Sequence, residues 1–424
     1  MIPVPWEEVE ALELGLLDRG GAGGEITGIS ADSRDVGQGD LFVALNTGVA
    51  YVNDARARGA ATLVPDDQEA ALAALAKLVR SKSEARAVAV VGSVGKTTTK
   101  DVLGALCAAH VPTVWAEKSL NNEIGLPLTV CRLEPDTRVL VTEMGMRGLG
   151  QIAYLCDLAR PEIVVVTHIG PEHLELVGTI DRVAEANAEA IAALPEGGTA
   201  IVPARCPELE PFLSRGDVTF RRFSHEDVEA HSDATRFSVR EEVVELELPF
   251  TQRYLAVNVL AALHAYDALG LPLDEAGRGV GDIRLSPWRG EEVALPGGGL
   301  VVNDAYNANP DSMRAALEHL AARAGGRRRI AILGEMAELG HESERYHREI
   351  GELAEGLGVE VIGVGEPARA YRPAAWAEDG SQAVELARER LRPGDAVLVK
   401  ASRAVGLEGI AAEIANIAET WSPS

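Results

Sequence analysis

The sequence predicts an α/β protein in which helices cover parallel sheets. Three observations predict this fold class. The chain has 424 residues, enough for two or three domains. Short apolar runs alternate with helical segments along most of it, and one run leads through a glycine-containing loop into a helix. Such alternation places helices on both faces of a parallel sheet. We therefore expect domains over residues 1–84, 85–287 and 288–424.

The first block is expected to be a small α/β domain. Short apolar runs at 26–30 and 41–45 predict strands, and an alanine-rich stretch at 69–79 predicts a helix. The charged residues 81–84 then form a link to the second block.

The second block is expected to hold a parallel sheet. Apolar runs predict strands at 88–91, 139–142, 163–167 and 199–202, and the alternating pattern over 218–249 is typical of antiparallel strands. Ligands of parallel sheets bind beyond the carboxyl ends of the strands. The loop at 92–98, Glu143 and the segment 168–173 should therefore lie along one edge of the sheet.

The third block repeats the alternation and predicts a second, smaller doubly wound domain. The expected strands are 300–303, 329–333, 359–364 and 396–399, and the expected helices are 312–324 and 346–357.

The composition excludes several classes of protein. A net charge of −25 argues against a nucleic-acid partner or an anionic membrane surface. The four cysteines, Cys107, Cys131, Cys156 and Cys206, show no C-x-x-C spacing, which favours free thiols in a reducing compartment. No apolar run approaches the length of about 18 residues that a membrane span needs, and the first residues lack a basic stretch. We expect a cytoplasmic protein without a membrane span.

The loop over 92–98 has the features of a phosphate-binding loop. Glycines let backbone N–H groups approach phosphate oxygens, and a following helix adds its positive N-terminal dipole. Lys96 is placed to reach the β- and γ-phosphates, and the hydroxyl of Thr97 or Thr98 to bind Mg²⁺. Val90 stands where the usual pattern has glycine, so the loop is a shorter variant. The alternative is a strand-to-helix turn with a chance Gly-Lys-Thr.

Polar side chains at other strand ends are candidates for chemistry. Glu143 is either a Mg²⁺ ligand or a solvated surface residue, and His173 is either a metal ligand or a structural histidine. The loop over 119–125 offers amides for a polar substrate or forms an ordinary turn. In the run 303–310, Asp304 and the asparagines suit a nucleotide, while Asn309 or Asp311 could cap the next helix.

Together these segments resemble the Mur ligase family over nearly the whole chain. The resemblance is carried by SADSR at 30–34, GSVGKTTTKD at 92–101, NNEIGLP at 121–127, TEMGMRGLG at 142–150, THIGPEHLEL at 167–176, DAYNANP at 304–310, LGEMAELG at 333–340 and VKASR at 399–403. DAYNANP is the most discriminating motif and is similar to that of the members that use D-alanyl-D-alanine. The Asp-Asn-Pro-Arg-type signature of the diaminopimelate- or lysine-adding members is absent from the sequence.

The resemblance implies a three-domain architecture: an N-terminal domain that binds a UDP-linked substrate, a central P-loop ATPase domain and a C-terminal Rossmann-like domain. It implies a ligase of peptidoglycan precursor synthesis that uses ATP and Mg²⁺. Its substrates would be UDP-N-acetylmuramoyl-tripeptide and D-alanyl-D-alanine, joined through an acyl phosphate. It also implies a monomer.

The resemblance further assigns site residues. The catalytic residues would be Lys96, Glu143 and His173. The ATP site would comprise Gly92, Ser93, Val94, Gly95, Lys96, Thr97, Thr98, Asn258, Arg289, Asp304 and Asn307. The other substrates would contact Ser33, Arg34, Asn121, Asn122, Tyr306 and Asn309. Metal ions would be held by Thr97, Thr98, Glu143 and His173.

Three departures from the family pattern keep alternatives open. Asn187 stands where the family has a carbamylated lysine, which leaves Glu185 or Glu189 as candidates to hold a second Mg²⁺. Tyr254 replaces a histidine four residues before Asn258, and the loop over 45–51 is short. The alternatives are a related amide ligase with another acceptor and a nucleotide-binding homologue with weakened chemistry.

Overall fold

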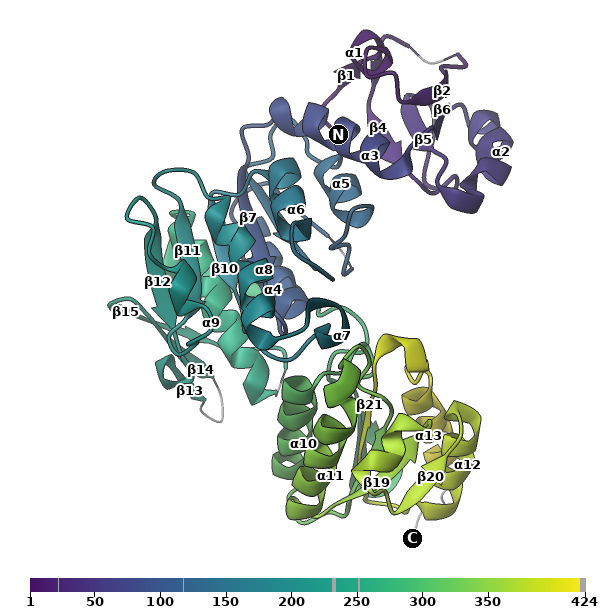
Figure 1. Ribbon diagram of the computed structural model, residues 1–424, viewed down its shortest axis with the longest axis vertical. Coiled ribbons are helices and arrows are strands. Elements are labelled where there is room, and N and C mark those ends of the chain that lie inside the picture. Colours follow the sequence, from purple (N-terminus) through teal and green to yellow (C-terminus); the bar gives the residue numbers. More distant parts are fainter. Residues whose placement is uncertain (22, 117, 231–233, 251, 420–424) are drawn as a thin grey trace. The chain divides into compact units, whose positions relative to one another are not determined.

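The computed structural model describes residues 1–21, 23–116, 118–230, 234–250 and 252–419 (Figure 1). The chain divides into two compact units. The first contains residues 1–167, 185–249 and 258–284, and the second contains residues 168–184, 250–257 and 285–424. The three domain boundaries expected from the sequence stay a prediction.

The N-terminal part of the first unit is a four-stranded sheet with short helices. The sheet has the order β2-β6-β5-β4, in which β4, β5 and β6 are parallel and β2 is antiparallel to β6. Its elements are β1 (Val4–Pro5), α1 (Trp6–Glu10), β2 (Gly15–Asp18), β3 (Glu25–Ile26), β4 (Gly28–Ser30), β5 (Asp40–Val43), α2 (Val52–Ala57), β6 (Ala61–Pro65) and α3 (Gln68–Ser81). The run expected as one strand at 26–30 is divided between β3 and β4. β3 pairs instead with β1.

The centre of the first unit is a six-stranded parallel sheet of order β12-β11-β10-β7-β9-β8. Its strands are β7 (Arg86–Val91), β8 (Thr113–Trp115), β9 (Val139–Glu143), β10 (Ile163–Val166), β11 (Thr199–Pro203) and β12 (Thr219–Phe223). The helices along this part of the chain are α4 (Lys96–Ala108), α5 (Gly125–Val130), α6 (Gln151–Ala159), α7 (Leu174–Val177), α8 (Ile180–Ala192) and α9 (Arg253–Ala268). Val88 and Val164 are completely buried, as expected for strands covered on both faces. The predicted parallel sheet is confirmed.

One local expectation is corrected. The region 218–249 is not wholly antiparallel, because β12 pairs in parallel with β11 at the sheet edge. The antiparallel part is a separate sheet of β13 (Val228–Ala230), β14 (Thr235–Val239) and β15 (Glu242–Leu246). In the phosphate loop, α4 begins at Lys96, where Gly95 adopts a left-handed φ of 88° and serves as the N-cap.

The C-terminal part of the second unit is a doubly wound sheet of order β16-β17-β21-β18-β19-β20. All neighbours are parallel except β16, which is antiparallel to β17. Its strands are β16 (Glu291–Leu295), β17 (Gly299–Asn303), β18 (Arg329–Leu333), β19 (Val359–Val364), β20 (Ala375–Ala377) and β21 (Ala396–Lys400). Its helices are α10 (Pro310–Ala324), α11 (Ser343–Gly356), α12 (Gly380–Arg390) and α13 (Ile410–Glu419). The second doubly wound domain predicted from the sequence is thus present.

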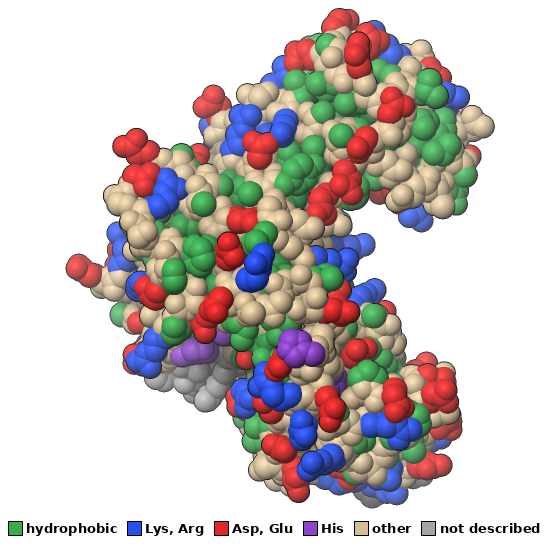
Figure 2. Space-filling model, in the orientation of Figure 1, with side chains coloured by type: hydrophobic (Ala, Val, Ile, Leu, Met, Phe, Trp, Pro, Cys, Tyr) green, Lys and Arg blue, Asp and Glu red, His purple; other side chains and the backbone are tan. Residues whose placement is uncertain are grey.

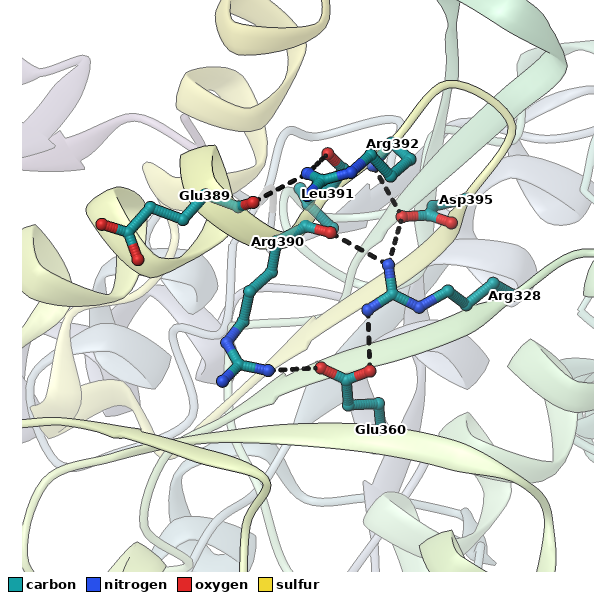
Figure 3. Close-up of polar contacts among 7 residues, drawn as sticks. All are labelled: Arg328, Glu360, Glu389, Arg390, Leu391, Arg392 and Asp395. Atoms are coloured by element: carbon teal, nitrogen blue, oxygen red, sulfur yellow. Dashed lines mark hydrogen bonds and ion pairs between the residues drawn. The ribbon is translucent and has the colours of Figure 1, made fainter.

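The amino ends of these strands carry a charge network (Figure 3). Arg328 donates to Glu360 at 2.7 Å and to Asp395 at 3.4 Å, and Arg390 donates to the other oxygen of Glu360 at 2.9 Å. The Arg328 guanidinium lowers the pKa of the Glu360 carboxyl below its ordinary value. These contacts tie three strand starts to the end of α12. They stabilise the sheet at the end opposite to the one where ligands of parallel sheets bind.

The surface carries mixed charges. Figure 2 shows acidic and basic side chains interspersed over the visible face, with no continuous basic area among the described residues there. Within the described parts of the chain, no helix is both long enough and apolar enough to cross a membrane.

Candidate functional site

A glycine loop leaves the centre of the parallel sheet at the end of β7. Gly92 and Gly95 have φ values of 125° and 88°, conformations that side chains with a Cβ rarely adopt. The hydroxyl of Thr167, just after β10, donates to the carbonyls of Val91 at 3.1 Å and Val94 at 2.6 Å. The loop is therefore held from the neighbouring strand. It delivers its backbone N–H groups to the N-terminus of α4, an arrangement that favours anion binding.

Asn258, from α9, closes one side of this loop. A Cβ added at Gly95 would overlap the side-chain amide of Asn258, so the close approach requires glycine. The structure thus brings together two residues that the sequence assigned to the nucleotide from positions far apart in the chain.

The first turn of α4 carries the predicted lysine and threonines. Lys96 Nζ donates back to the carbonyl of Gly92, and the hydroxyls of Thr97 and Ser119 lie 3.0 Å apart. Thr97 and Thr98 are both buried. The Lys96 ammonium is thus held at the loop itself, within reach of the oxygens the loop would bind.

Lys100, one turn further along α4, was not singled out from the sequence. Its ammonium is fully buried, donates to the carbonyl of Ala116 and pairs with Asp101 at 2.6 Å. It also reaches the carbonyl of Lys118 at 3.3 Å. Lys100 therefore anchors the chain just before the Asn121 loop. The only sequence signal is a lysine inside an otherwise buried helix pattern.

Glu143 ends β9, the strand next to β7. Its side chain is 2% exposed, and its Oε1 accepts a hydrogen bond from Asn121 Nδ2 at 2.8 Å. No described residue donates to Oε2, which is buried. A buried carboxylate oxygen without a donor is costly unless a cation binds it. Mg²⁺ prefers oxygen ligands and takes one or two carboxylates, so the Glu143 carboxylate fits this ion.

Of the two roles predicted for the loop over 119–125, substrate contact or turn formation, Asn122 has the second. Its Oδ1 accepts from the N–H groups of Ile124 at 3.3 Å and Gly125 at 2.9 Å, so that it closes the turn before α5. Asn121 and Asn122 therefore differ: the first reaches Glu143, and the second supports the loop.

The residues expected to hold the uridine end lie after β4. Ser33 is buried, and the side chain of Arg34 is 81% exposed. Arg34 forms two parallel contacts with Asp32, with Nη2 at 2.5 Å and Nε at 2.9 Å. This pairing lowers the pKa of the Asp32 carboxyl far below its ordinary value. The exposed guanidinium is oriented by that carboxylate and stays accessible to an anion.

In the second unit, Lys400 organises the loop that follows β17. Its Nζ is buried and donates to Asp304 Oδ2 at 2.6 Å and to the carbonyl of Asn307 at 2.9 Å. The two nucleotide candidates of this loop are thus held by one lysine at the end of β21.

Arg289 and Tyr306 also come together. The guanidinium of Arg289 lies over the Tyr306 ring, 4.1 Å from its centroid. Asn309 instead caps α10, accepting from Ser312 N–H at 2.9 Å. Its predicted substrate contact therefore competes with a capping role.

Tyr254 packs edge-on against His319, with the two ring centroids 5.8 Å apart. Burial raises the pKa of the Tyr254 hydroxyl well above its ordinary value.

His173 lies in the second unit and is the N-cap of α7, with a left-handed φ of 52°. Its Nδ1 contacts Glu338 Oε2, and its Nε2 lies 4.0 Å from Glu172. The carboxylate of Glu338 thus orients the ring through one nitrogen. A ring oriented in this way suits a metal ligand, because a second group commonly fixes the ring of a ligating histidine.

Asn187 and Glu189 lie on α8. Asn187 is 1% exposed. Both carboxylate oxygens of Glu189 accept backbone N–H groups at the start of α6, from Gly150 at 2.5 Å and Ala153 at 3.0 Å. Glu189 therefore caps a helix, which counts against it as the replacement metal ligand. Among the described residues, no group of three or more His, Cys, Asp or Glu side chains could hold a metal by itself.

A cavity of about 460 Å³ lies elsewhere, at the edge strand β12. Its lining includes Arg221, Arg240 and His264. Both arginines pair with Asp267, at 2.5 Å and 2.8 Å. The two arginines share this one carboxylate, and the acidic side chain of Asp227 also lines the cavity, so the cavity does not call for an anionic ligand.

Comparisons with known proteins point to one family. The profile of the Mur ligase middle domain matches residues 90–266, and that of the Mur ligase glutamate ligase domain matches residues 288–403. The UDP-N-acetylmuramoyl-tripeptide–D-alanyl-D-alanine ligase of Escherichia coli (strain K12) is 31% identical, over 92% of this chain and 94% of its own. The ligase of that name from Bacillus subtilis (strain 168) is 30% identical, over 92% of this chain and 93% of its own.

Solved structures agree. A crystal structure of MurF from Acinetobacter baumannii matches with a TM-score of 0.84 and 25% identity, over 98% of this chain and 99% of that one. MurF from Thermotoga maritima, crystallised with ADP, matches with a TM-score of 0.78 and 28% identity, over 92% of this chain and 98% of that one.

Proposed function

The chain belongs to the Mur ligase family, and on that basis we propose that it joins D-alanyl-D-alanine to UDP-N-acetylmuramoyl-tripeptide in peptidoglycan precursor synthesis, at the expense of ATP. The structural observation that carries the proposal is the position of Glu143 on β9, where the strand register places it opposite Val90, two residues before the loop at 92–98. That carboxylate is buried, and its second oxygen has no donor among the described residues. It suits Mg²⁺ bound with a nucleotide.

The reaction solves a general difficulty of amide synthesis, because a carboxylate is a poor acyl donor. Transfer of the γ-phosphoryl group of ATP to the terminal carboxylate of the tripeptide gives an acyl phosphate and ADP. The free amine of the dipeptide then attacks the acyl carbon. The tetrahedral intermediate loses phosphate, the nitrogen loses a proton, and an amide bond remains.

The residues of the first unit bind and neutralise the phosphates. The N–H groups of the glycine loop and the ammonium of Lys96 contact the phosphate oxygens, which lowers the repulsion between two reacting anions. Thr97, Thr98 and Glu143 hold Mg²⁺, which supplies charge neutralisation when it is bound. Asn121 keeps the Glu143 carboxylate in place through its 2.8 Å hydrogen bond.

Each unit carries its own proposed nucleotide contacts. In the second unit these are Arg289 and the residues Asp304 and Asn307 of the loop held by Lys400. In the first unit Asn258 of α9 lies beside the phosphate loop. His173 is proposed to hold a second Mg²⁺, with its ring oriented by Glu338. Tyr306 and Asn309 are proposed to face the peptide substrates, and Ser33 and Arg34 the uridine diphosphate.

The test is phosphate release with ATP and Mg²⁺. UDP-N-acetylmuramoyl-tripeptide and D-alanyl-D-alanine are added separately and then together. Release that needs both, with the UDP-linked pentapeptide as product by mass spectrometry, is the expected result. ATP binding without release under any combination would contradict the proposal.

Asn187 favours a second candidate, a related amide ligase that uses another acceptor. A panel of amino acids and dipeptides offered in place of D-alanyl-D-alanine distinguishes the two. We further propose that the enzyme is monomeric and cytoplasmic, as its resemblance to the Mur ligase family implies. Light scattering of the purified chain tests the oligomeric state.

A further inference from the structure

A short segment at the end of β21, residues 400–402, lies between two loops of the C-terminal sheet. β21 is flanked by β17 and β18. The loop after β17, residues 304–309, carries the proposed nucleotide contacts, and the loop after β18 spans residues 334–340. Any side chain that leaves the end of β21 can therefore touch both loops.

Ser402 makes contacts with both. Its side chain is 4% exposed. The hydroxyl donates to the carbonyl of Ala308 at 3.2 Å and accepts from the N–H of Ala337 at 2.8 Å. A hydroxyl group can donate and accept at once, so one atom joins the two loops. The backbone N–H of Ser402 adds a bond to the carbonyl of Glu335 at 2.9 Å.

The 334–340 loop in turn holds the segment that carries His173. Glu338 contacts His173 Nδ1 through its carboxylate, and its carbonyl accepts the N–H of Glu175 at 3.0 Å. Gly340 packs on the backbone of Glu175, because a Cβ added at Gly340 would lie 3.1 Å from the Cα of Glu175. The two loops, Ser402 and the 173–175 segment all belong to the second unit.

The same loop is anchored on its other side. His347 Nε2 accepts from the N–H of Met336 at 3.0 Å, and its Nδ1 lies 2.7 Å from the carbonyl of Ser343. The accepting Nε2 leaves Nδ1 as the protonated nitrogen, and burial lowers the pKa of this imidazole. The hydroxyl of Tyr371 donates to the carbonyl of Gly334 at 2.8 Å. Because these contacts fix the first residues of the 334–340 loop, a shift of Ala337 displaces Glu338, the next residue.

We propose that Ser402 is a positioning residue that couples a nucleotide bound at the 304–309 loop to the hold of Glu338 on His173 and Glu175. This inference rests on the proposed function, because it takes the 304–309 loop as a nucleotide contact. Its specific content is that a hydroxyl at position 402 carries the coupling. Removing it leaves the Ala337 N–H without its acceptor and breaks the side-chain link between the two loops, while the backbone bond from Ser402 to Glu335 remains.

The test is hydrogen exchange followed by mass spectrometry on the full chain, with and without ADP and Mg²⁺. In the wild type, ADP is expected to slow exchange in peptides that cover 304–309 and 172–178. In Ser402→Ala, ADP is expected to protect 304–309 but not 172–178. Ser402→Thr keeps a hydroxyl and restores protection of both. Ser381→Ala, an exposed serine in α12, is the control and behaves as wild type.

Turnover gives a second readout. Ser402→Ala is expected to lower kcat about tenfold, the effect of one lost bond to a buried group, while KM for ATP changes less than about twofold. If ADP still protected both 304–309 and 172–178 in Ser402→Ala, the inference would be overturned. It would also be overturned if, in the wild-type protein, ADP protected 304–309 but not 172–178. Absence of protection at 304–309 in the wild type would overturn the nucleotide assignment itself. A thermal melt confirms that each variant is folded.

Discussion

Asn121 donates a hydrogen bond to one carboxylate oxygen of Glu143 at 2.8 Å, while the other oxygen of Glu143 is buried without a donor among the described residues. The amide fixes the carboxylate and leaves one coordination position open. A buried charge arranged in this way destabilises the protein unless a cation binds it. The relationship therefore connects the stability of the first unit with its function.

Glu143→Gln separates these two effects. The glutamine can still accept from Asn121 but loses the negative charge. We expect phosphate release to fall about 100-fold or more, because a charged metal ligand is lost. The midpoint of thermal unfolding should stay the same or rise, because a buried unpaired charge is removed. Activity and a midpoint both close to wild type would contradict the assignment. Glu134→Gln, an exposed glutamate that follows α5, is the matched control.

Lys96→Met tests the phosphate contact. The ammonium bonds to the Gly92 carbonyl of its own loop. Methionine keeps most of the length of the side chain and removes the ammonium, with its charge and its hydrogen-bond donors. We expect kcat/KM for ATP to fall about 1000-fold, the size of effect found when a charge that stabilises a transition state is removed. Lys77→Met, which breaks a surface pair with Asp157, should leave turnover unchanged. Full activity of Lys96→Met in the phosphate-release assay would exclude the mechanism.

The buried strands could be predicted from the sequence because strands covered on both faces are continuous apolar runs, as at Val88–Val91 and Ile163–Val166. Glu143 could be predicted because it interrupts such a run at the strand end. The edge strands β16 and β20 escaped prediction. β16 exposes most of its side chains and β20 has only three residues, so neither has an apolar run.

The supporting contacts of the site could not be predicted. Lys100 and Lys400 both bind carbonyl groups far away in the chain, such as Ala116 and Asn307. Carbonyl groups are present in every residue, so no sequence pattern marks which of them a lysine will reach. Asn309 shows a different limit, because an amide that caps a helix and an amide that binds a ligand follow the same pattern.

Asn187 leads to a prediction about carbon dioxide. An amide side chain cannot be carbamylated, and Asn187 is buried in α8. We therefore expect turnover to be the same in degassed, bicarbonate-free buffer and in buffer with about 50 mM bicarbonate. Assays at saturating substrates after prolonged dialysis at low bicarbonate measure it. A clear rise of kcat with bicarbonate would show that another lysine is carbamylated, and Lys→Arg variants of the six lysines would identify it.

The last prediction concerns His264, a buried residue of α9 beside Phe223. Burial, reinforced by the charge of Arg221, lowers the pKa of His264 to about 4. In the unfolded chain the ordinary value of about 6.5 returns. Between these values the unfolded chain binds more protons, so the free energy of unfolding decreases as the pH falls from about 6.5 to about 4. His264 alone lowers the free energy of unfolding by at most about 3 kcal/mol, and most of this decrease has occurred by pH 4.

His264→Leu removes the titrating group and keeps an apolar side chain of similar size. Urea unfolding at pH 7 and pH 5 should show a smaller decrease in the transition midpoint than in the wild type. Some decrease remains, because burial also lowers the pKa of His347 in the second unit. His341→Gln, an exposed histidine, should keep the full wild-type dependence. If His264→Leu lost as much stability as the wild type between the two pH values, another group would be responsible for the acid sensitivity.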